Sequence, residues 1–208
     1  MKQRLSLLLF IAIVAAMTAG ADTFYGIYVN GTKVTSSNTS WTIGSGTVSY
    51  NHSSNTLTLN NATISRSGTD KNAIDVEASS NRTSSALTIV FTGTNSLNAA
   101  NADAVVCRAD VILNVSGTTT FTTTAGDQYA LRAKNGACIY PRGSGTLNLN
   151  ATDGCAIYGD GNGSLSATIA TLNLSGKRGN LCRMSSVYLL PSSNSTSTTT
   201  TVTFKPTK

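Results

Sequence analysis

Segment 101–105, NADAV, contains a pattern that returns twice, as DQYAL at 127–131 and DGCAI at 153–157. Each copy has Asp or Asn, two variable residues, Ala and an aliphatic residue, and the interval is 26 residues both times. An earlier copy, DKNAI at 70–74, stands 31 residues before the first, as if one repeat had a longer loop. A fixed period of this length is typical of stacked-repeat folds, in which each unit buries its apolar face against the next.

Two further segments with alternating apolar residues lie between successive copies. In our alignment the inward positions of the first segment are Leu87, Ile89 and Phe91, then Val111, Leu113 and Val115, then Ala137, Ile139 and Pro141. The second follows a glycine in each repeat and is aligned at Leu97, Phe121 and Leu147. Three short strands per period, separated by Gly, Asn, Ser and Thr, are what one coil of a parallel β-helix requires. We therefore predict an all-β fold, a single parallel β-helix of about four to five coils.

Alternation within the repeated pattern predicts which side chains fill the interior. The predicted core residues are Ile74, Val76, Leu87, Ile89, Val105, Leu113, Leu131, Ile139, Leu147 and Ile157. The intervening positions should face solvent: Asp75 and Glu77, Val106 and Arg108, Arg132 and Lys134, Tyr158 and Asp160. If the last member of each pair forms one column, Glu77 should face Arg108 and Lys134 should face Asp160, which would help to fix the strand register.

The chain begins with Lys2 and Arg4, an apolar run at 5–17 and the small residues AGA at 19–21. This order of charge, apolar run and small residues predicts a secretory signal peptide over 1–21. The apolar run is too short for a membrane span, and polar sequence follows it, so we expect no span after cleavage. The predicted mature protein is exported, to the extracellular space, the cell surface or the periplasm.

Residues 22–190 are predicted to form one domain, and 191–208 a Ser/Thr-rich tail. Within the domain, 22–50 differs from the repeats. The segment YVNGTKVT at 28–35 predicts a hairpin, because Asn-Gly supplies the positive φ angles of a two-residue turn. A second hairpin should pair 47–50 with 56–59, whose second strand starts the first coil. A β-helix has open apolar ends, so we assign 22–50, with Trp41, to an N-terminal cap and 51–190 to the coils.

The chain has four cysteines: Cys107, Cys138, Cys155 and Cys182. Export would permit disulfides. Cys107 is predicted to point into the interior, where a small apolar side chain is wanted. We expect buried structural thiols with at most one bridge, for which the best candidate pair is Cys155 with Cys182, which fall in adjacent coils one position out of register.

Composition excludes some partners. The formal net charge is +6, and about +4 without residues 1–21, with no basic run beyond Lys177 and Arg178. Nucleic-acid binding would require a basic stripe with interleaved aromatic residues, which is absent, so we expect no nucleic-acid partner.

The N-terminal phrases IYVNGTKVT at 27–35 and NTLTLNNATI at 55–64, with the later Ala-Ile and Leu-Thr-Ile segments, resemble a group of secreted bacterial proteins. These are carbohydrate-binding-domain-containing, right-handed β-helix repeat proteins, common in gut and rumen anaerobes. The resemblance implies a right-handed parallel β-helix and polysaccharide binding, in some members with calcium. It implies no catalytic motif.

Two sets of residues are candidates for binding. One set forms a predicted column at one corner of the coils: Asp70, Asp127 and Asp153, with Asn101. Their stacked oxygens could bind Ca²⁺, the one candidate cofactor. The alternative is that each residue forms an Asx turn with its own backbone. The solvent-facing residues Arg108, Arg132, Lys134 and Tyr158 form the predicted ligand face. Tyr158 would stack on a sugar, and the basic groups would favour acidic sugars such as uronates.

We therefore expect an exported polysaccharide-binding β-helix protein without catalytic activity. A structural or adhesive repeat protein of the cell envelope is the alternative, and a polysaccharide lyase or hydrolase is the third hypothesis. An enzyme would need convergent acids, or acids with a base, across coils. The sole histidine, His52, lies in a predicted hairpin turn and would be alone as a catalytic base.

Overall fold

The computed structural model describes residues 21–124, 126–189 and 201–204, of which the last segment is described by its backbone alone. The predicted leader and most of the predicted tail lie outside these residues. Within the described part, the secondary structure consists of strands, and no helix is long and apolar enough to cross a bilayer.

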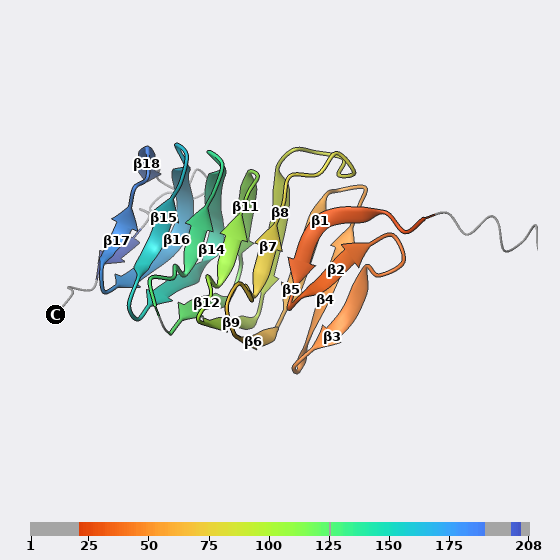
Figure 1. Ribbon diagram of the computed structural model, residues 1–208, viewed down its shortest axis with the longest axis horizontal. Helices are drawn as coiled ribbons and strands as arrows, with labels where there is room; N and C mark the ends of the chain where they lie inside the picture. Colours follow the sequence, from red (N-terminus) through yellow and green to blue (C-terminus); the bar gives the residue numbers. More distant parts are fainter. Residues whose placement is uncertain (1–20, 125, 190–200, 205–208) are drawn as a thin grey trace, which may run out of the picture.

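The strands wind into a parallel β-helix with three faces (Figure 1). Face 1 is the seven-stranded sheet of β1 (Phe24–Val29), β2 (Thr32–Thr35), β7 (Ile74–Val76), β10 (Val105–Cys107), β13 (Leu131–Ala133), β15 (Cys155–Gly159) and β17 (Gly179–Cys182). Face 2 contains β3 (Ser40–Ile43), β4 (Gly46–Asn51), β5 (Thr56–Asn60), β8 (Leu87–Thr92), β11 (Val111–Val115), β18 (Ser186–Leu189) and the first halves of β14 (Cys138–Ala151) and β16 (Ser164–Gly176). Face 3 contains β6 (Thr63–Ser67), β9 (Thr94–Ala100), β12 (Thr118–Thr123), β19 (Thr201–Phe204) and the second halves of β14 and β16.

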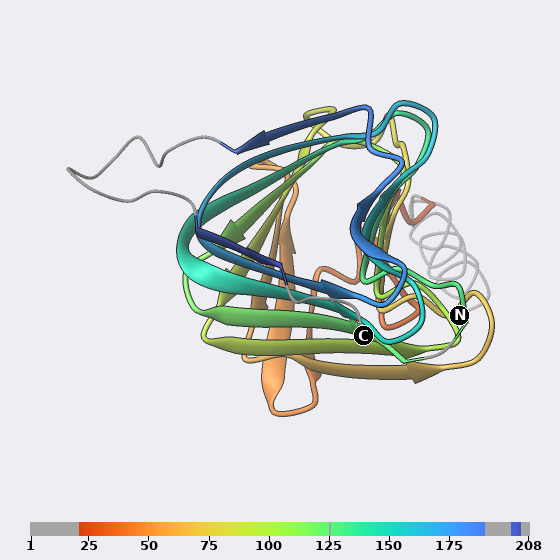
Figure 2. The same ribbon diagram turned by 90° about the vertical axis from the view of Figure 1, so that its left-hand side faces the viewer.

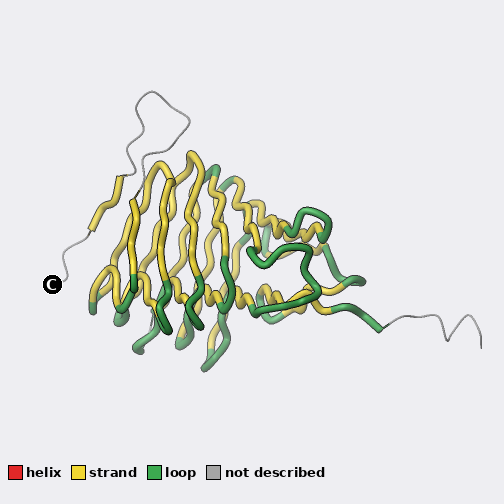
Figure 3. Tube along the Cα trace, turned by 90° about the horizontal axis from the view of Figure 1, so that it is seen from above, coloured by secondary structure: helices red, strands yellow, loops and turns green. Residues whose placement is uncertain are grey.

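The fold prediction is confirmed in class and in period, with about four turns and a repeat of about 26 residues. Seen from the C-terminal coils, the chain runs counterclockwise as it approaches the viewer, which makes the β-helix right-handed (Figure 2). Viewed from above, the coils lie side by side along the axis, and loops line one edge of the stack (Figure 3).

Both predicted hairpins form the N-terminal cap. Asn30 and Gly31 have φ of 52° and 77°, as the two-residue turn between β1 and β2 requires. Strand β1 then extends face 1 by pairing antiparallel with β7, and β4 pairs antiparallel with β5, which starts the coils. The hairpins therefore extend faces 1 and 2 with antiparallel strands.

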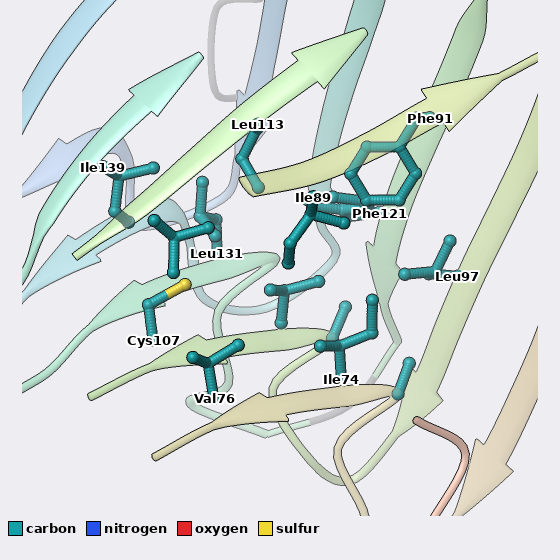
Figure 4. Close-up of a cluster of buried hydrophobic side chains, with 14 of the residues drawn as sticks. Ile74, Val76, Ile89, Phe91, Leu97, Cys107, Leu113, Phe121, Leu131 and Ile139 are labelled. Atoms are coloured by element: carbon teal, nitrogen blue, oxygen red, sulfur yellow. The ribbon is translucent and has the colours of Figure 1, made fainter. Parts of the chain in front are cut away.

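The interior of the coils is filled as predicted. All ten predicted core residues are completely buried, and Figure 4 shows several of them converging from different faces. Leu131 lies between Val105 and Ile157 in the strand register, which confirms the predicted stacking on face 1.

The predicted register on faces 2 and 3 is wrong by two residues in one coil. Val111 pairs with Ile139, not with Ala137, and Phe121 pairs with Leu149, not with Leu147. The corner from β13 to β14 is two residues longer than the corner from β10 to β11. The connection from β14 to β15 is shorter than that from β12 to β13 by the same amount. The two changes cancel on face 1, so the 26-residue spacing hides them.

In the later coils, β16 pairs in parallel with β14, and β18 and β19 pair in parallel with β16. On face 1, Leu181 of β17 pairs with Ile157 of β15.

A disulfide joins Cys155 to Cys182, the best candidate pair, and links two neighbouring coils. Cys107 is a free, completely buried thiol inside the coils, as predicted, and burial raises its pKa well above the usual range. Cys138 is free and partly exposed, with its Sγ 2.9 Å from the Ser164 hydroxyl.

Candidate functional site

The outer surface of face 1 receives its side chains from the repeated pattern. The four alanines of the pattern are completely buried, and so are the aliphatic residues that directly follow them. Alternation therefore restarts at each alanine: both the residue before it and the second residue after it lie outside. In the coil of β13 these are Tyr129 and Arg132, which are only partly buried.

One outward row crosses the five middle strands of face 1, from β1 to β15. Tyr28 of β1 pairs with Asp75, Asp75 with Val106, Val106 with Arg132, and Arg132 with Tyr158. Neighbouring rungs are about 4.8 Å apart, so the row from Tyr28 to Tyr158 is about 19 Å long. The row has a tyrosine at each end and charged groups between.

Val106, predicted to face solvent, is only 1% exposed. It does not belong to the core cluster, and it lies between Asp75 and Arg132 in the register. We infer that the ion-paired side chains of these flanking rungs shield it from outside. The prediction of an exposed side chain here is wrong.

Arg108, a predicted ligand residue, is held by Asp75 of the preceding coil. Its Nε and Nη2 donate to the two carboxylate oxygens at 3.2 and 3.1 Å, and Asn72 donates to the same carboxylate at 3.0 Å. The predicted partner of Arg108 was Glu77, and this pairing is wrong: the guanidinium fork binds both oxygens of Asp75, two residues earlier in the chain.

Arg132 is shared between two carboxylates. Its Nη1 lies 3.2 Å from Asp103 and its Nη2 lies 3.7 Å from Asp160, so Asp160 pairs with Arg132 rather than with the predicted Lys134. Asp103 is 5% exposed and also accepts the Tyr129 N–H at 2.8 Å. Burial raises the pKa of Asp103 even though this hydrogen bond and the charge of Arg132 both lower it.

Two tyrosines stack beside Arg132. The rings of Tyr129 and Tyr158 are 4.1 Å apart with an interplanar angle of 14°. The Arg132 guanidinium lies 5.2 Å from one ring centroid and 5.4 Å from the other. From the next coil, Arg183 lies 5.8 Å from the Tyr158 ring and donates to its hydroxyl at 2.9 Å. Burial raises the pKa of Tyr129. We call Tyr129, Arg132, Tyr158 and Arg183 the tyrosine–arginine cluster.

The structure thus brings Arg132 and Tyr158 together and adds residues that the sequence prediction missed. Tyr129 and Arg183 were missed, and so was Tyr28. The restart of alternation at Ala130 could have revealed Tyr129. Tyr28 could be placed only once β1 was known to extend face 1. Lys134 and Arg183 form no ion pair with a carboxylate in the part of the chain that the structure describes.

The acidic column predicted for calcium does not converge. Asp153 accepts from Lys177 at 2.8 Å, and Asp127 pairs with Arg178. Asp70 has a φ of 57°, and Asn101 one of 65°, a left-handed conformation that Asp and Asn adopt more readily than other L-residues. Among the described residues, no group of three or more His, Cys, Asp or Glu side chains is placed to hold a metal. The calcium hypothesis stays a prediction, and no contact of these side chains supports it.

His52 lies at the cap, where its ring stacks on Tyr25 at 4.8 Å. Three carboxylates on face 1, Asp75, Asp103 and Asp160, are engaged by an arginine. The chemistry available on this surface is therefore hydrogen bonding from guanidinium and phenol groups, together with contact to aromatic rings.

The resemblance to secreted β-helix proteins stays an expectation, because other evidence of relationship is lacking. In comparisons with known proteins, no family model, no curated protein and no solved structure matches the chain.

Proposed function

We propose that this chain is an exported polysaccharide-binding β-helix protein without catalytic activity, and that the ligand lies along face 1. The observation that carries the proposal is the tyrosine–arginine cluster. It gathers two aromatic rings and two guanidinium groups from successive coils onto one surface. Aromatic and arginine side chains are enriched at binding hot spots.

The row from Tyr28 to Tyr158 gives the ligand a direction. An extended sugar chain running along the helix axis would pass one rung about every 4.8 Å. It would meet the phenol groups of the terminal tyrosines and, between them, the Asp75 carboxylate and the Arg132 guanidinium on either side of Val106. These groups can donate to and accept from sugar hydroxyls.

A preference for acidic sugars would come from Lys134 and Arg183. Arg108 and Arg132 contribute less net attraction, because Asp75, Asp103 and Asp160 neutralise them. The same three ion pairs support binding without cleavage, since the arginines occupy carboxylates that an enzyme would need as free acids or bases. The Cys155–Cys182 disulfide supports export, because disulfides persist mainly in oxidising compartments.

A structural or adhesive role is the second candidate. It is favoured by β18, where Val187, Tyr188 and Leu189 are 36%, 59% and 44% exposed. An exposed apolar strand at the last coil is a surface on which another chain could add a strand.

Pull-down on insoluble plant polysaccharides, followed by a glycan array, tests the proposal. The wild type should be retained, and Arg132→Ala and Tyr158→Ala should each reduce retention. Tyr140→Ala is the matched control, because Tyr140 also lies beside an arginine, Arg142 at 5.6 Å, but on face 2. If no glycan retains the wild type, or if all variants behave alike, the adhesive hypothesis replaces this one.

A further inference from the structure

A hollow of about 520 Å³ lies where the loop between β7 and β8 meets the corner between β10 and β11. The polar residues that line it are two arginines, one aspartate and three serines: Arg82, Arg108, Asp110, Ser79, Ser80 and Ser85. Arg108 connects the hollow to the outer surface of face 1. We call this hollow the Arg82 pocket.

Arg82 is a buried cation without a counter-ion. Its side chain belongs to a residue that is 8% exposed, and no carboxylate pairs with it among the described residues. Nη1 donates to the Tyr25 carbonyl at 3.5 Å, the outer limit of a hydrogen bond, and Nε has no partner. Arginine stays protonated in proteins, so burial of this charge is unfavourable unless an anion balances it.

The other polar groups of the Arg82 pocket restrict which anion fits. The Arg108 guanidinium is occupied by Asp75. Asp110 accepts the Cys138 N–H through one oxygen at 2.8 Å, which leaves its other oxygen to accept a hydroxyl. The negative charge of Asp110 opposes an anion that has no hydroxyl to donate to it. A ligand with one carboxylate and several hydroxyls satisfies both Arg82 and Asp110.

We propose that the Arg82 pocket binds a sugar acid, with the carboxylate on Arg82 and the ring hydroxyls on Asp110 and the serines. This proposal deepens the proposed function. It rests on that function because the sugar acid is taken to be one unit of the polysaccharide held on face 1. Because Arg108 adjoins both places, a uronate in the pocket could continue as a chain along the outer row of face 1.

Nuclear magnetic resonance titration of the folded wild-type protein with sodium galacturonate tests the proposal directly. The Nε–H signal of Arg82 should shift on binding. Arg66 is an internal control, since its Nε is also buried without a partner but the residue does not line the pocket. Galactose should leave the Arg82 signal in place because it lacks the carboxylate, and acetate should do so because it lacks the hydroxyls.

Arg82→Gln should weaken galacturonate binding at least about tenfold, since charge-assisted hydrogen bonds are lost. Arg82→Lys should weaken it less, because the charge remains. No shift of Arg82 with galacturonate, or an equal shift with acetate, would overturn the sugar-acid assignment, and neither result requires a variant to fold. Polysaccharide retention that depends on Tyr158 while galacturonate leaves Arg82 unaffected would refute the pocket alone. A shift of Arg82 with galacturonate, together with polysaccharide retention that does not depend on Tyr158, would refute the face 1 proposal alone.

Discussion

Replacing Cys155 and Cys182 together by alanine removes the covalent link between the coil of β15 and the coil of β17. The two cysteines are 27 residues apart in sequence. In the chain-entropy treatment, a crosslink that closes a loop of this length stabilises the folded state by about 3.5 kcal/mol at 25 °C. Each coil of a β-helix contacts mainly its neighbours, so we expect the loss to fall on the last coils, β17 and β18, before the rest of the domain.

Urea unfolding at 25 °C, with and without reductant, measures this loss, and hydrogen exchange locates it. The double variant and the reduced wild type should lose about 3.5 kcal/mol of unfolding free energy. Amides of β17 should lose protection while those of β10 keep it. Cys138→Ala is the control, because Cys138 is a free thiol. A loss below about 1 kcal/mol, or uniform loss of protection through all coils, would refute the reasoning from loop closure and neighbour-only contact.

Leu131→Ala should lower the unfolding free energy by about 2–5 kcal/mol, because the side chain is completely buried between neighbouring coils; a loss below about 1 kcal/mol in urea unfolding would contradict this core. Asn55→Ala should lower the unfolding free energy by about 3 kcal/mol, because the buried side-chain amide accepts from the Tyr50 hydroxyl and donates to the carbonyls of Ser84 and Ala86. An unchanged melting temperature in calorimetry would contradict this prediction. Burial raises the pKa of Asp103 above 3.8, so the folded state binds this proton more tightly than the unfolded state does. The resulting stabilisation is complete below pH 3.8 and is lost as pH rises through the pKa of the folded state. Asp103→Asn should remove this pH dependence in unfolding curves, and an unchanged profile would contradict the assignment.

The fold was predictable because one strand per coil keeps a constant spacing. The pattern ending in Val105, Leu131 and Ile157 gave the stacking on face 1 correctly. The register on face 2 was not predictable from that spacing. The corner near Asn135 has two extra residues, and the connection from β14 to β15 is two residues shorter, so the spacing on face 1 does not change. The compensation becomes visible only when the strands pair.

The candidate site was predictable in part. Alternation placed Arg132 and Tyr158 on the outer surface, where they lie. It could not show which charges pair: Arg108 pairs with Asp75 rather than with Glu77, and Asp160 pairs with Arg132 rather than with Lys134. Tyr129 was missed because the outward positions were counted only after each alanine of the pattern, whereas Tyr129 precedes Ala130.

The binding constant for the best-retained polysaccharide, measured by isothermal titration calorimetry, tests the central claim most directly. Wild type and Tyr140→Ala should bind alike, whereas Tyr129→Ala/Tyr158→Ala should bind at least about tenfold more weakly, which corresponds to about 1.4 kcal/mol. No new reducing ends should appear during the titration, because the proposed activity is binding alone. Equal binding by all three proteins, or release of reducing ends by the wild type, would contradict the account.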